Sequence, residues 1–438
     1  MKTPIFDFVK GYAKQNITRA HMPGHKGVKG TEKYDITEVF GADVLYSESG
    51  IIGTSQQNAS FLFRSGATLY SCEGSTLCIK AMLGVIAELS GGKPLILAGR
   101  NAHKSFINAC ALLDIEAQWL YGEGDSLCEC KITSENLHKA LETMPKKPDA
   151  VYITSPDYLG NIADIKSLSS VCKEYNIPLI VDNAHGAYLR FLNDTRHPVN
   201  LGAVMCADSA HKTLPVLTGG AYLHIGEGYE HLLEIAKRKM RLFASTSPSY
   251  LTLCSLDKCN AYLGREYFEN AVNRVARLKA DLGKKGYKLV GSEPLKITID
   301  CAEYGYFGEE IAACLRNRKI ECEFADNRFL VLMLSPENTK RDFVRIKNAL
   351  KDIPKKPPIT SSNLKAEKGE MVMSIRSAVL SRSETVNTEN AVGRICAAPT
   401  VSCPPAVPIA VSGEIITENT IKLLKEYKIE KINVLKEV

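Results

Sequence analysis

The sequence predicts an α/β protein, with a large domain built on a mostly parallel sheet and a smaller α+β region towards the C-terminus. Between residues 93 and 225, short apolar runs rich in β-branched residues alternate with segments of helical period. After residue 290 the order changes to strand, helix, two strands and helix. The 438 residues are 45% apolar and 24% charged, which is the balance of a globular protein with a buried core.

The predicted strands of the large domain are continuous apolar runs, as expected for parallel strands covered on both faces. They lie at residues 94–99, 149–156 and 177–182. The segments 104–113 and 164–176 have the helical period, and the apolar positions of the second are Ile165, Leu168, Val171, Cys172 and Tyr175. Core packing alone explains this stripe.

The second half of the chain predicts a different architecture. One long helical region is expected over residues 255–285. A strand at 295–300, a helix at 308–319, two strands around the turn Asp326-Asn327 and a helix at 341–353 then describe the α+β region. Residues 355–370, rich in Pro, Lys and Ser, predict a linker.

Composition argues against several classes of function. The 55 Lys+Arg and 49 Asp+Glu leave a net charge of +6, and the basic runs are short and scattered, so we expect no nucleic-acid partner. No signal peptide and no run of about 18 apolar residues is visible, which predicts a cytoplasmic protein without a membrane partner. The 14 cysteines form no CxxC pair, so we expect no metal.

Two places predict contact with a small ligand. Gly74, Ser75 and Thr76 open an apolar helix, where backbone N–H groups and the helix dipole favour a phosphate. An ordinary Ser/Thr helix cap is the alternative. His103 follows the predicted strand at 94–99, and a purely structural histidine is the alternative there.

Two further places carry charge at strand ends. Asp182 ends an apolar strand, where a buried carboxylate needs a cationic partner, and a loop-capping Asp is the alternative. Lys212 lies between two apolar strands, with Ser209 and His211 beside it. Together, a phosphate-binding helix start, an Asp for a ring nitrogen and a Lys for a Schiff base are what pyridoxal 5′-phosphate requires. No GxGxxG or Walker motif supports a nucleotide instead.

Several motifs resemble those of the pyridoxal-phosphate-dependent ornithine/lysine/arginine decarboxylase family, in its short form and with an aspartate-aminotransferase-like fold (fold type I). The most specific are HMPGHKG (21–27) and SAHKTLPVLT (209–218). The resemblance covers nearly the whole chain and includes DITEVFGADVL (35–45), SPDYLG (155–160), VDNAHGAY (181–188) and STSPSYLTLCSLD (245–257).

The resemblance implies a role for each matching residue. Lys212 would form the Schiff base, Asp182 would pair with the pyridinium nitrogen, and His103 would stack on the ring. His185 would lie beside the cofactor, and His211 is a candidate for proton handling. The residues implied in phosphate binding are Gly74, Ser75, Thr76 and Ser209.

The resemblance also implies a domain division and an assembly. The expected segments are an N-terminal arm (1–48), a cofactor-binding large domain (49–290), a small α+β domain (291–354), a linker (355–370) and a C-terminal segment (371–438). HMPGHKG and STSPSY would lie near the mouth of the active site at a dimer interface. We therefore expect a homodimer or a higher homo-oligomer.

Three positions depart from the family pattern. Glu73 stands where Asn is usual before Gly-Ser-Thr, and Gly219 stands where relatives commonly have Gln. The C-terminal motif, usually Tyr-Pro-Pro-Gly-Ile-Pro, is here Cys403 to Pro408 with the sequence CPPAVP. The cofactor residues are intact, so these departures bear on substrate choice.

The implied reaction is decarboxylation of a basic L-amino acid to an amine and CO₂, as in polyamine biosynthesis. Arginine is favoured, followed by lysine or ornithine. A basic substrate needs a carboxylate for its distal cation, and the candidates are Glu38, Asp43, Glu48 and Glu389. The alternatives are another fold type I reaction, such as aminotransfer or elimination, and a catalytically weak homologue with a regulatory role.

Overall fold

The computed structural model describes residues 1–47, 50–124, 126–360, 365–401 and 406–436. The chain forms two compact units. Unit 1 contains Met1–Gly92 and Ile165–Tyr267, and unit 2 contains Lys93–Asp164 and Phe268–Val438. The five-segment division expected from the sequence stays a prediction.

Unit 1 is built on four strands whose residues are all buried. Their order is β1 (Ala67–Ser71), β7 (Ala221–Ile225), β6 (Met205–Asp208) and β5 (Leu179–Asp182). β5 and β6 are parallel, while β7 runs antiparallel to both β6 and β1. The helices of unit 1 are α1 (Pro4–Lys14), α2 (Ile51–Phe63), α3 (Gly74–Leu89), α6 (Ile165–Glu174), α7 (Ala210–Thr213), α8 (Leu233–Phe243) and α9 (Tyr250–Tyr262). Short 3₁₀ turns lie at Gly30–Tyr34, Ala187–Phe191, Pro198–Asn200 and Glu230–Leu232.

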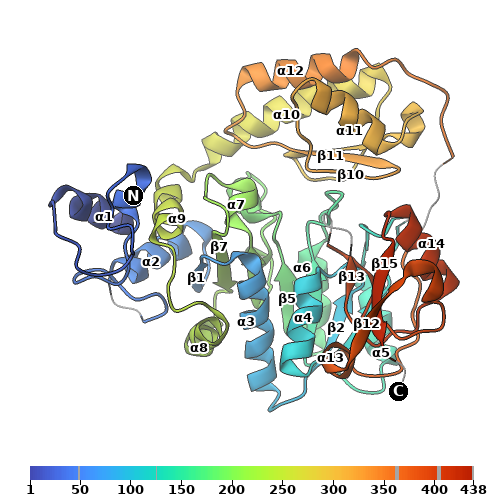
Figure 1. Ribbon diagram of the computed structural model, residues 1–438, viewed down its shortest axis with the longest axis horizontal. Helices are drawn as coiled ribbons and strands as arrows, with labels where there is room; N and C mark the ends of the chain where they lie inside the picture. The colour runs from blue at the N-terminus through green and yellow to red at the C-terminus, as the bar shows by residue number, and fades with distance from the viewer. Residues whose placement is uncertain (48–49, 125, 361–364, 402–405, 437–438) are drawn as a thin grey trace. The chain divides into compact units, whose positions relative to one another are not determined.

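A buried carboxylate joins three helices of unit 1, α1, α2 and α9, which lie close together in Figure 1. Asp257 of α9 accepts a hydrogen bond from Ser55 Oγ of α2 at 2.6 Å and another from the Phe6 N–H of α1 at 2.9 Å. Ser55 Oγ is also 2.8 Å from the Tyr70 hydroxyl of β1. Burial raises the pKa of Asp257. This network therefore fixes the N-terminal helices against the sheet of unit 1.

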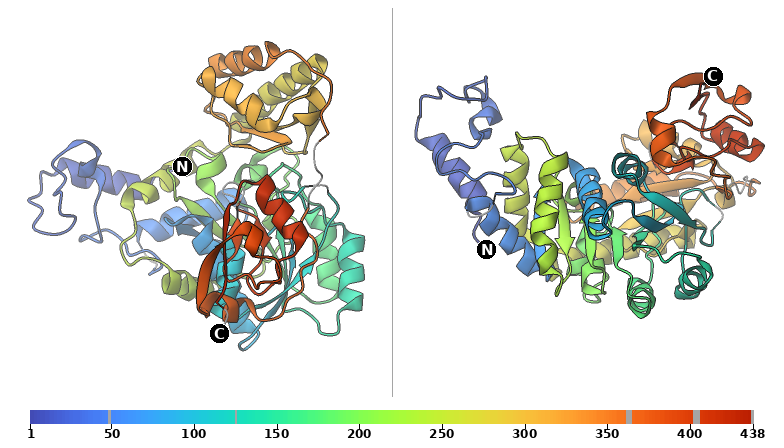
Figure 2. Two further views of the ribbon diagram at one scale, coloured as in Figure 1. Left: turned by 45° about the vertical axis from the view of Figure 1, so that its right-hand side comes forward. Right: turned by 90° about the horizontal axis from the view of Figure 1, so that it is seen from below.

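Unit 2 contains parallel strands and a separate antiparallel sheet. The parallel strands are β4 (Ala150–Thr154), β2 (Leu95–Gly99) and β3 (Glu116–Leu120), in that order. The second sheet has the order β10 (Phe324–Ala325), β11 (Phe329–Met333), β9 (Lys296–Asp300) and β8 (Lys288–Val290). Figures 1 and 2 show α10 (Arg265–Lys285), α11 (Gly308–Asn317) and α12 (Lys340–Lys351) on one side of it.

The remaining elements of unit 2 flank the parallel strands or follow the antiparallel sheet in the chain. They are α4 (Lys104–Leu113), α5 (Ser134–Thr143), α13 (Ile375–Leu380), α14 (Glu418–Glu426), β12 (Ser383–Asn387), β13 (Thr400–Val401), β14 (Pro408–Ala410) and β15 (Lys431–Leu435), with 3₁₀ turns at Ala302–Tyr304 and Thr388–Asn390. β12 pairs with β15 and β13 with β14, both antiparallel. The Arg376 guanidinium of α13 donates to the Ala111 and Leu112 carbonyls of α4, which ties the C-terminal segment to the parallel strands' helical layer.

The predicted α/β class is confirmed, and the predicted strands at 94–99, 149–156, 177–182 and 295–300 are present as β2, β4, β5 and β9. The predicted helical region over 255–285 is present, but it is divided into two helices. α9 ends at Tyr262 and α10 begins at Arg265, with Leu263 and Gly264 between them, because glycine is a poor helix former. The short strand β8 is an addition to the predicted strand–helix–strand–strand–helix order.

A buried ion pair connects the SPDYLG loop with the antiparallel sheet of unit 2. Lys296 Nζ lies 3.0 Å from Glu293 Oε2, and each side chain is 1% exposed. Lys296 also donates to the Asp157 carbonyl at 3.3 Å. Burial raises the pKa of Asp157 to about 6, although Asn161 donates two hydrogen bonds to its carboxylate. The conformation of the SPDYLG loop is therefore stabilised by the buried charged groups of Lys296 and Asp157.

We expect Lys296→Met to lower the free energy of unfolding by about 3–5 kcal/mol, because it leaves the buried Glu293 carboxylate without its cation. The double variant Lys296→Met/Glu293→Gln should recover most of that loss. Lys347→Met is the control, since Lys347 and Asp281 form an exposed pair worth at most about 1 kcal/mol. Urea unfolding midpoints test this, and equal effects of Lys296→Met and Lys347→Met would contradict it.

Candidate active site

Two neighbouring strands of unit 1 end in carboxylates. Asp182 ends β5 and Asp208 ends β6, and the two strands are parallel and paired. Asp182 is 2% exposed, and its Oδ1 accepts the Ala184 N–H at 3.2 Å. Because ligands bind beyond the carboxyl ends of parallel strands, Asp182 is placed to meet a cationic ligand group.

Lys212 lies in the short helix α7, which follows β6 directly through Ser209. The Lys212 Nζ is 3.0 Å from His185 Nε2, and His185 lies three residues after Asp182. The loops that follow β5 and β6 therefore bring the predicted Schiff-base lysine and the predicted cofactor-side histidine together. Lys212 itself is half-buried, which suits an amine that must meet a ligand.

The predicted phosphate site lies at the start of α3. Gly74 is the first residue of this helix and has a φ of +71°, and its N–H donates to the Gly219 carbonyl at 2.7 Å. Ser75 and Thr76 follow in the first turn, and Ser209 Oγ donates to Ser75 Oγ at 2.8 Å. Two predicted phosphate residues from different elements therefore meet at a helix N-terminus, which favours an anion.

His211 is held by the loop before β7. Its backbone N–H and its Nδ1 both lie within hydrogen-bond distance of the Gly220 carbonyl, at 3.1 and 3.0 Å. A carbonyl only accepts, so Nδ1 carries the hydrogen and Nε2 is the basic nitrogen. Burial lowers the pKa of His211, and the neighbouring Lys212 charge lowers it further against the opposing effect of Gly220. Both effects favour the neutral form of the His211 ring.

His103 belongs to unit 2. It caps the N-terminus of α4, where its Nδ1 accepts the Ser105 N–H at 3.1 Å and lies 2.8 Å from Ser105 Oγ. The next residue, Lys104, donates its N–H to the Ala406 carbonyl at 3.0 Å. These contacts fix the His103 backbone and ring nitrogen, and the stacking role implied for the ring stays a prediction.

The departures from the family pattern have specific structural settings. Glu73 Oε1 accepts the Ser245 N–H at 2.6 Å, so this carboxylate binds the backbone of the STSPSY segment. Gly219 has a φ of +93°, and a Cβ there would lie 2.6 Å from the Cys72 carbonyl oxygen. A glutamine therefore does not fit this loop conformation. Ala406 has a φ of +57°, a conformation that favours the glycine usual at this position, while 402–405 lie outside the described residues.

The four acidic candidates for the substrate cation are not equivalent. Asp43 Oδ2 accepts the N–H groups of Gly50 and Ile52 at 3.0 Å, which makes it a cap for α2. Glu389 lies in unit 2 and pairs with Lys425 at 2.7 Å. Glu38 is exposed in unit 1, and Glu48 lies outside the described residues.

The two motif segments expected near the site mouth both belong to unit 1. In HMPGHKG, His25 Nε2 is 3.1 Å from Asp35 Oδ2, and His21 Nε2 is 2.8 Å from the Tyr12 hydroxyl. In STSPSY, the Tyr250 hydroxyl donates to the Asp43 carbonyl. The expected dimer interface at these segments stays a prediction.

The sequence analysis missed Asp208 and the residues around it. Asp208 is fully buried directly before Ser209, and its carboxylate contacts Asn183, His197 and His224. Its signal is the same as that of Asp182, a carboxylate at the end of an apolar strand.

The donor set of unit 1 fits pyridoxal 5′-phosphate. A lysine amine, a buried strand-end carboxylate and a hydroxyl pair at a helix N-terminus match its aldehyde, its ring nitrogen and its phosphate in charge and chemistry. All three groups come from the ends of β1, β5 and β6 or the loops after them. The residues present are therefore sufficient in kind to hold this cofactor.

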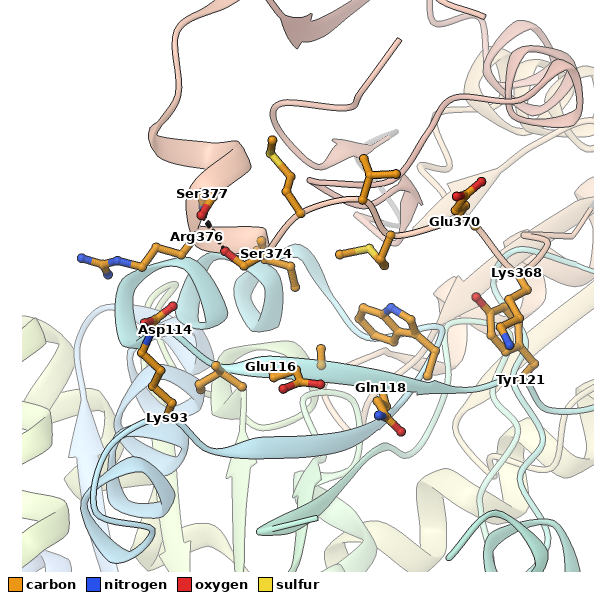
Figure 3. Close-up of a pocket in the computed structure, with 18 residues that line it drawn as sticks. Lys93, Asp114, Glu116, Gln118, Tyr121, Lys368, Glu370, Ser374, Arg376 and Ser377 are labelled. Atoms are coloured by element: carbon orange, nitrogen blue, oxygen red, sulfur yellow. Dashed lines mark hydrogen bonds and ion pairs between the residues drawn. The ribbon is translucent and has the colours of Figure 1, made fainter. Parts of the chain in front are cut away.

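A cavity of about 1110 Å³ lies elsewhere, within unit 2. Figure 3 shows Glu116 and Gln118 on β3, with Glu370, Ser374 and Arg376 on the C-terminal segment across the cavity. None of the residues predicted to bind the cofactor lines it. Its lining mixes acidic, basic and apolar side chains, so it does not resemble a phosphate site.

The described residues contain no helix that combines the length and the hydrophobicity required to cross a membrane.

Comparison with known proteins agrees with the cofactor chemistry of this donor set. The family model described as "Orn/Lys/Arg decarboxylase, major domain" matches residues 3–298.

Similar proteins match over nearly the full chain. The uncharacterized protein YaaO of Bacillus subtilis and an arginine decarboxylase of Halalkalibacterium halodurans are each 29% identical, over 97% of this chain and 94% and 93% of theirs. Among solved structures, the Francisella novicida lysine decarboxylase LdcF has a TM-score of 0.82 at 16% identity, over 99% of this chain and 81% of that one. The chain therefore belongs to the Orn/Lys/Arg decarboxylase family and is a pyridoxal-phosphate-dependent decarboxylase of basic amino acids with a type I fold.

Proposed function

We propose that this chain decarboxylates L-arginine, with lysine and ornithine as weaker substrates, and that the amine product enters polyamine biosynthesis. The observation that carries the proposal is the Lys212 amine 3.0 Å from His185, on the loops that follow two carboxylate-ended strands. The family gives decarboxylation of a basic amino acid, and the choice of arginine among the basic amino acids is what we propose in addition.

The choice of arginine is supported by how completely the relatives align. Arginine decarboxylases of Halalkalibacterium halodurans and Bacillus subtilis align over 93% of their own length, at 29% and 27% identity. The lysine decarboxylase LdcA of Pseudomonas aeruginosa aligns over only 40% of its length, at 22% identity. A guanidinium would make charge-assisted, two-pronged hydrogen bonds with a carboxylate. Glu38 and Glu48 remain the candidates for that carboxylate.

In the proposed mechanism each residue has a separate task. When bound, pyridoxal 5′-phosphate supplies the electron sink for the charge left on Cα by the departing CO₂. The start of α3 would hold the phosphate with Ser75, Thr76 and Ser209. Asp182 would favour a proton on the ring nitrogen, because a buried carboxylate stabilises a nearby cation. Lys212 Nζ is the amine that would hold the cofactor covalently.

His185 and His211 are the candidates for moving protons. His185 Nε2 lies close enough to Lys212 Nζ to exchange a hydrogen bond with it. His211 presents Nε2 as a base, because its Nδ1–H is engaged by Gly220. A neutral ring can take up a proton and return it within one turnover, which is the requirement for general acid–base catalysis.

The proposal includes an assembly and a location. The enzyme acts in the cytoplasm as a homodimer or a higher homo-oligomer, without nucleic-acid or membrane partners. The exposed Phe40, Met22 and Val28 in the N-terminal segment support a second copy covering this segment, since burying large exposed apolar side chains favours association.

We expect borohydride to fix the cofactor covalently to Lys212 in the purified protein, with loss of its visible absorption band. Lys212→Ala should fold normally, because the half-buried side chain serves chemistry, and should lose turnover and labelling. Lys239→Ala is the control, since Lys239 of α8 pairs with Glu88 of α3 and has no predicted role at the cofactor. Peptide mapping that places the label on another lysine would contradict the assignment.

We expect Asp182→Asn to keep the cofactor but lose about 3–5 kcal/mol of transition-state stabilisation, roughly a 10²–10⁴-fold fall in kcat. The amide preserves the shape and removes the charge that holds the ring-nitrogen proton. Asp194→Asn, at an 86% exposed side chain in the same unit, is the control. An unchanged kcat in Asp182→Asn would remove this residue from the proposed role.

We expect arginine to release CO₂ fastest in a panel with lysine, ornithine and norleucine, without any dependence on a keto acid. Norleucine should be slower by a factor on the order of 10⁴, because it leaves the receiving carboxylate unpaired. CO₂ release and the mass of the amine are the measurements. Dependence on a keto acid would favour aminotransfer, and turnover of only neutral or acidic amino acids would refute the substrate choice.

A further inference from the structure

Unit 1 contains a second cluster of ionisable side chains, which the proposed mechanism does not use. It consists of Asp208, His197 and His224, and all three are 0% exposed. His197 Nε2 is 2.8 Å from Asp208 Oδ2, and His224 Nε2 is 3.3 Å from the same oxygen. The Phe63 ring covers both imidazoles at centroid distances of 5.4 and 4.4 Å. The cluster is therefore removed from water.

The surrounding groups stabilise Asp208 as an anion. Burial by itself raises the pKa of this carboxyl, but the two facing histidines outweigh burial and hold the pKa well below its usual range. His224 has a further partner, because its Nδ1 is 2.8 Å from Thr68 Oγ1 of β1. Removal of one partner would leave the buried charge of Asp208 less well compensated.

The short His197 to Asp208 distance favours a hydrogen bond over a shared metal ion. The His197 to Asp208 separation of 2.8 Å is that of a charge-assisted hydrogen bond. Two ligands of one tetrahedral zinc ion lie about 3.3 Å apart, given metal–ligand bonds of about 2.0–2.1 Å. His197 therefore donates to Asp208, whereas His224 Nε2 lies 3.3 Å from the same oxygen without a hydrogen bond to it.

The cluster is connected to the proposed cofactor residues on both sides. Asp208 Oδ1 accepts a hydrogen bond from Asn183 Nδ2 at 2.7 Å, and the buried Asn183 directly follows Asp182. On its other side, Asp208 directly precedes Ser209, whose Oγ donates to Ser75 Oγ at 2.8 Å. One anion thus connects the strand end that carries Asp182 with the turn that carries Ser209 and Lys212.

We propose that Asp208, held by His197 and His224, is a positioning residue that fixes Asn183 and thereby the direction of the Asp182 carboxylate. It acts through Asn183 and does not touch the reacting atoms. This inference rests on the proposed role of Asp182 at the ring nitrogen. Precise positioning of the Asp182 carboxylate would matter for the rate, because displacing a catalytic group by about 1 Å can slow a reaction about 10²-fold.

Asn183→Ala tests the connection, since it cuts the link to Asp182 and leaves Asp208 and the two histidines in place. We expect kcat to fall about ten- to hundredfold with little change in KM, as for a loss of transition-state interactions alone. The visible absorption band of the bound cofactor should also titrate at a different pH. Asn260→Ala is the matched control, because Asn260 is a buried asparagine of the same unit that donates to Tyr70 Oη at 2.8 Å.

Asp208→Asn and Asp208→Ala form a second pair in case Asn183→Ala does not fold. The amide oxygen of Asp208→Asn can still accept from Asn183, so this variant should keep the wild-type titration of the absorption band, while Asp208→Ala should shift it. A band and a kcat that change no more in Asn183→Ala than in Asn260→Ala would overturn the proposal. Stoichiometric zinc in the purified wild type that is lost in Asp208→Ala would also overturn it, in favour of a metal site.

These outcomes are separable from those of the proposed function. The absorption titration needs only bound cofactor, and it can be measured even if none of the basic amino acids is decarboxylated. Failure of borohydride to label Lys212 would instead refute the cofactor site itself, whatever the Asn183 variants show.

Discussion

A carboxylate at the end of an apolar strand has to be paired with a cation or with hydrogen-bond donors, and much of unit 1 is arranged around two such carboxylates. Asp208 is satisfied by protein groups, namely Asn183 and two histidines. Asp182 has a backbone donor in Ala184 and stands where a ligand cation can approach. This difference underlies the two proposed roles, positioning for Asp208 and contact with the cofactor for Asp182, although both residues end neighbouring strands of the same sheet.

The loop before β7 and the start of α3 depend on each other. The Gly219 carbonyl accepts the Gly74 N–H, and Gly219 itself passes so close to the Cys72 carbonyl that no side chain fits. Glu73 fastens the same turn to Ser245. Glu73 and Gly219 therefore act together. Their contacts hold the backbone of the predicted phosphate site against two loops. The usual Asn and Gln would require another set of contacts.

Local patterns in the sequence were sufficient for the fold class and for most individual elements. Continuous apolar runs gave the positions of β2, β4 and β5, and the stripe from Ile165 to Cys172 is buried in α6. The motifs around Lys212, Asp182 and Ser75 were recognisable because cofactor chemistry demands particular residue types at strand ends and at helix starts. The break at Gly264 was missed because the helical period continues on both sides of it.

The sequence by itself determined which residue types are available for the cofactor, since charge, hydroxyl groups and helix starts are properties of local composition. Only the tertiary structure decided the partners: His185 for Lys212, Ser209 for Ser75, and Asn183 with two histidines for Asp208. It also decided that Asp43 caps a helix, which a list of acidic residues does not reveal. The physical reason is that the contacts of Lys212, Ser75 and Asp208 join residues from 11 to 134 positions apart. Their distances depend on how strands and loops pack, and no local pattern encodes that packing.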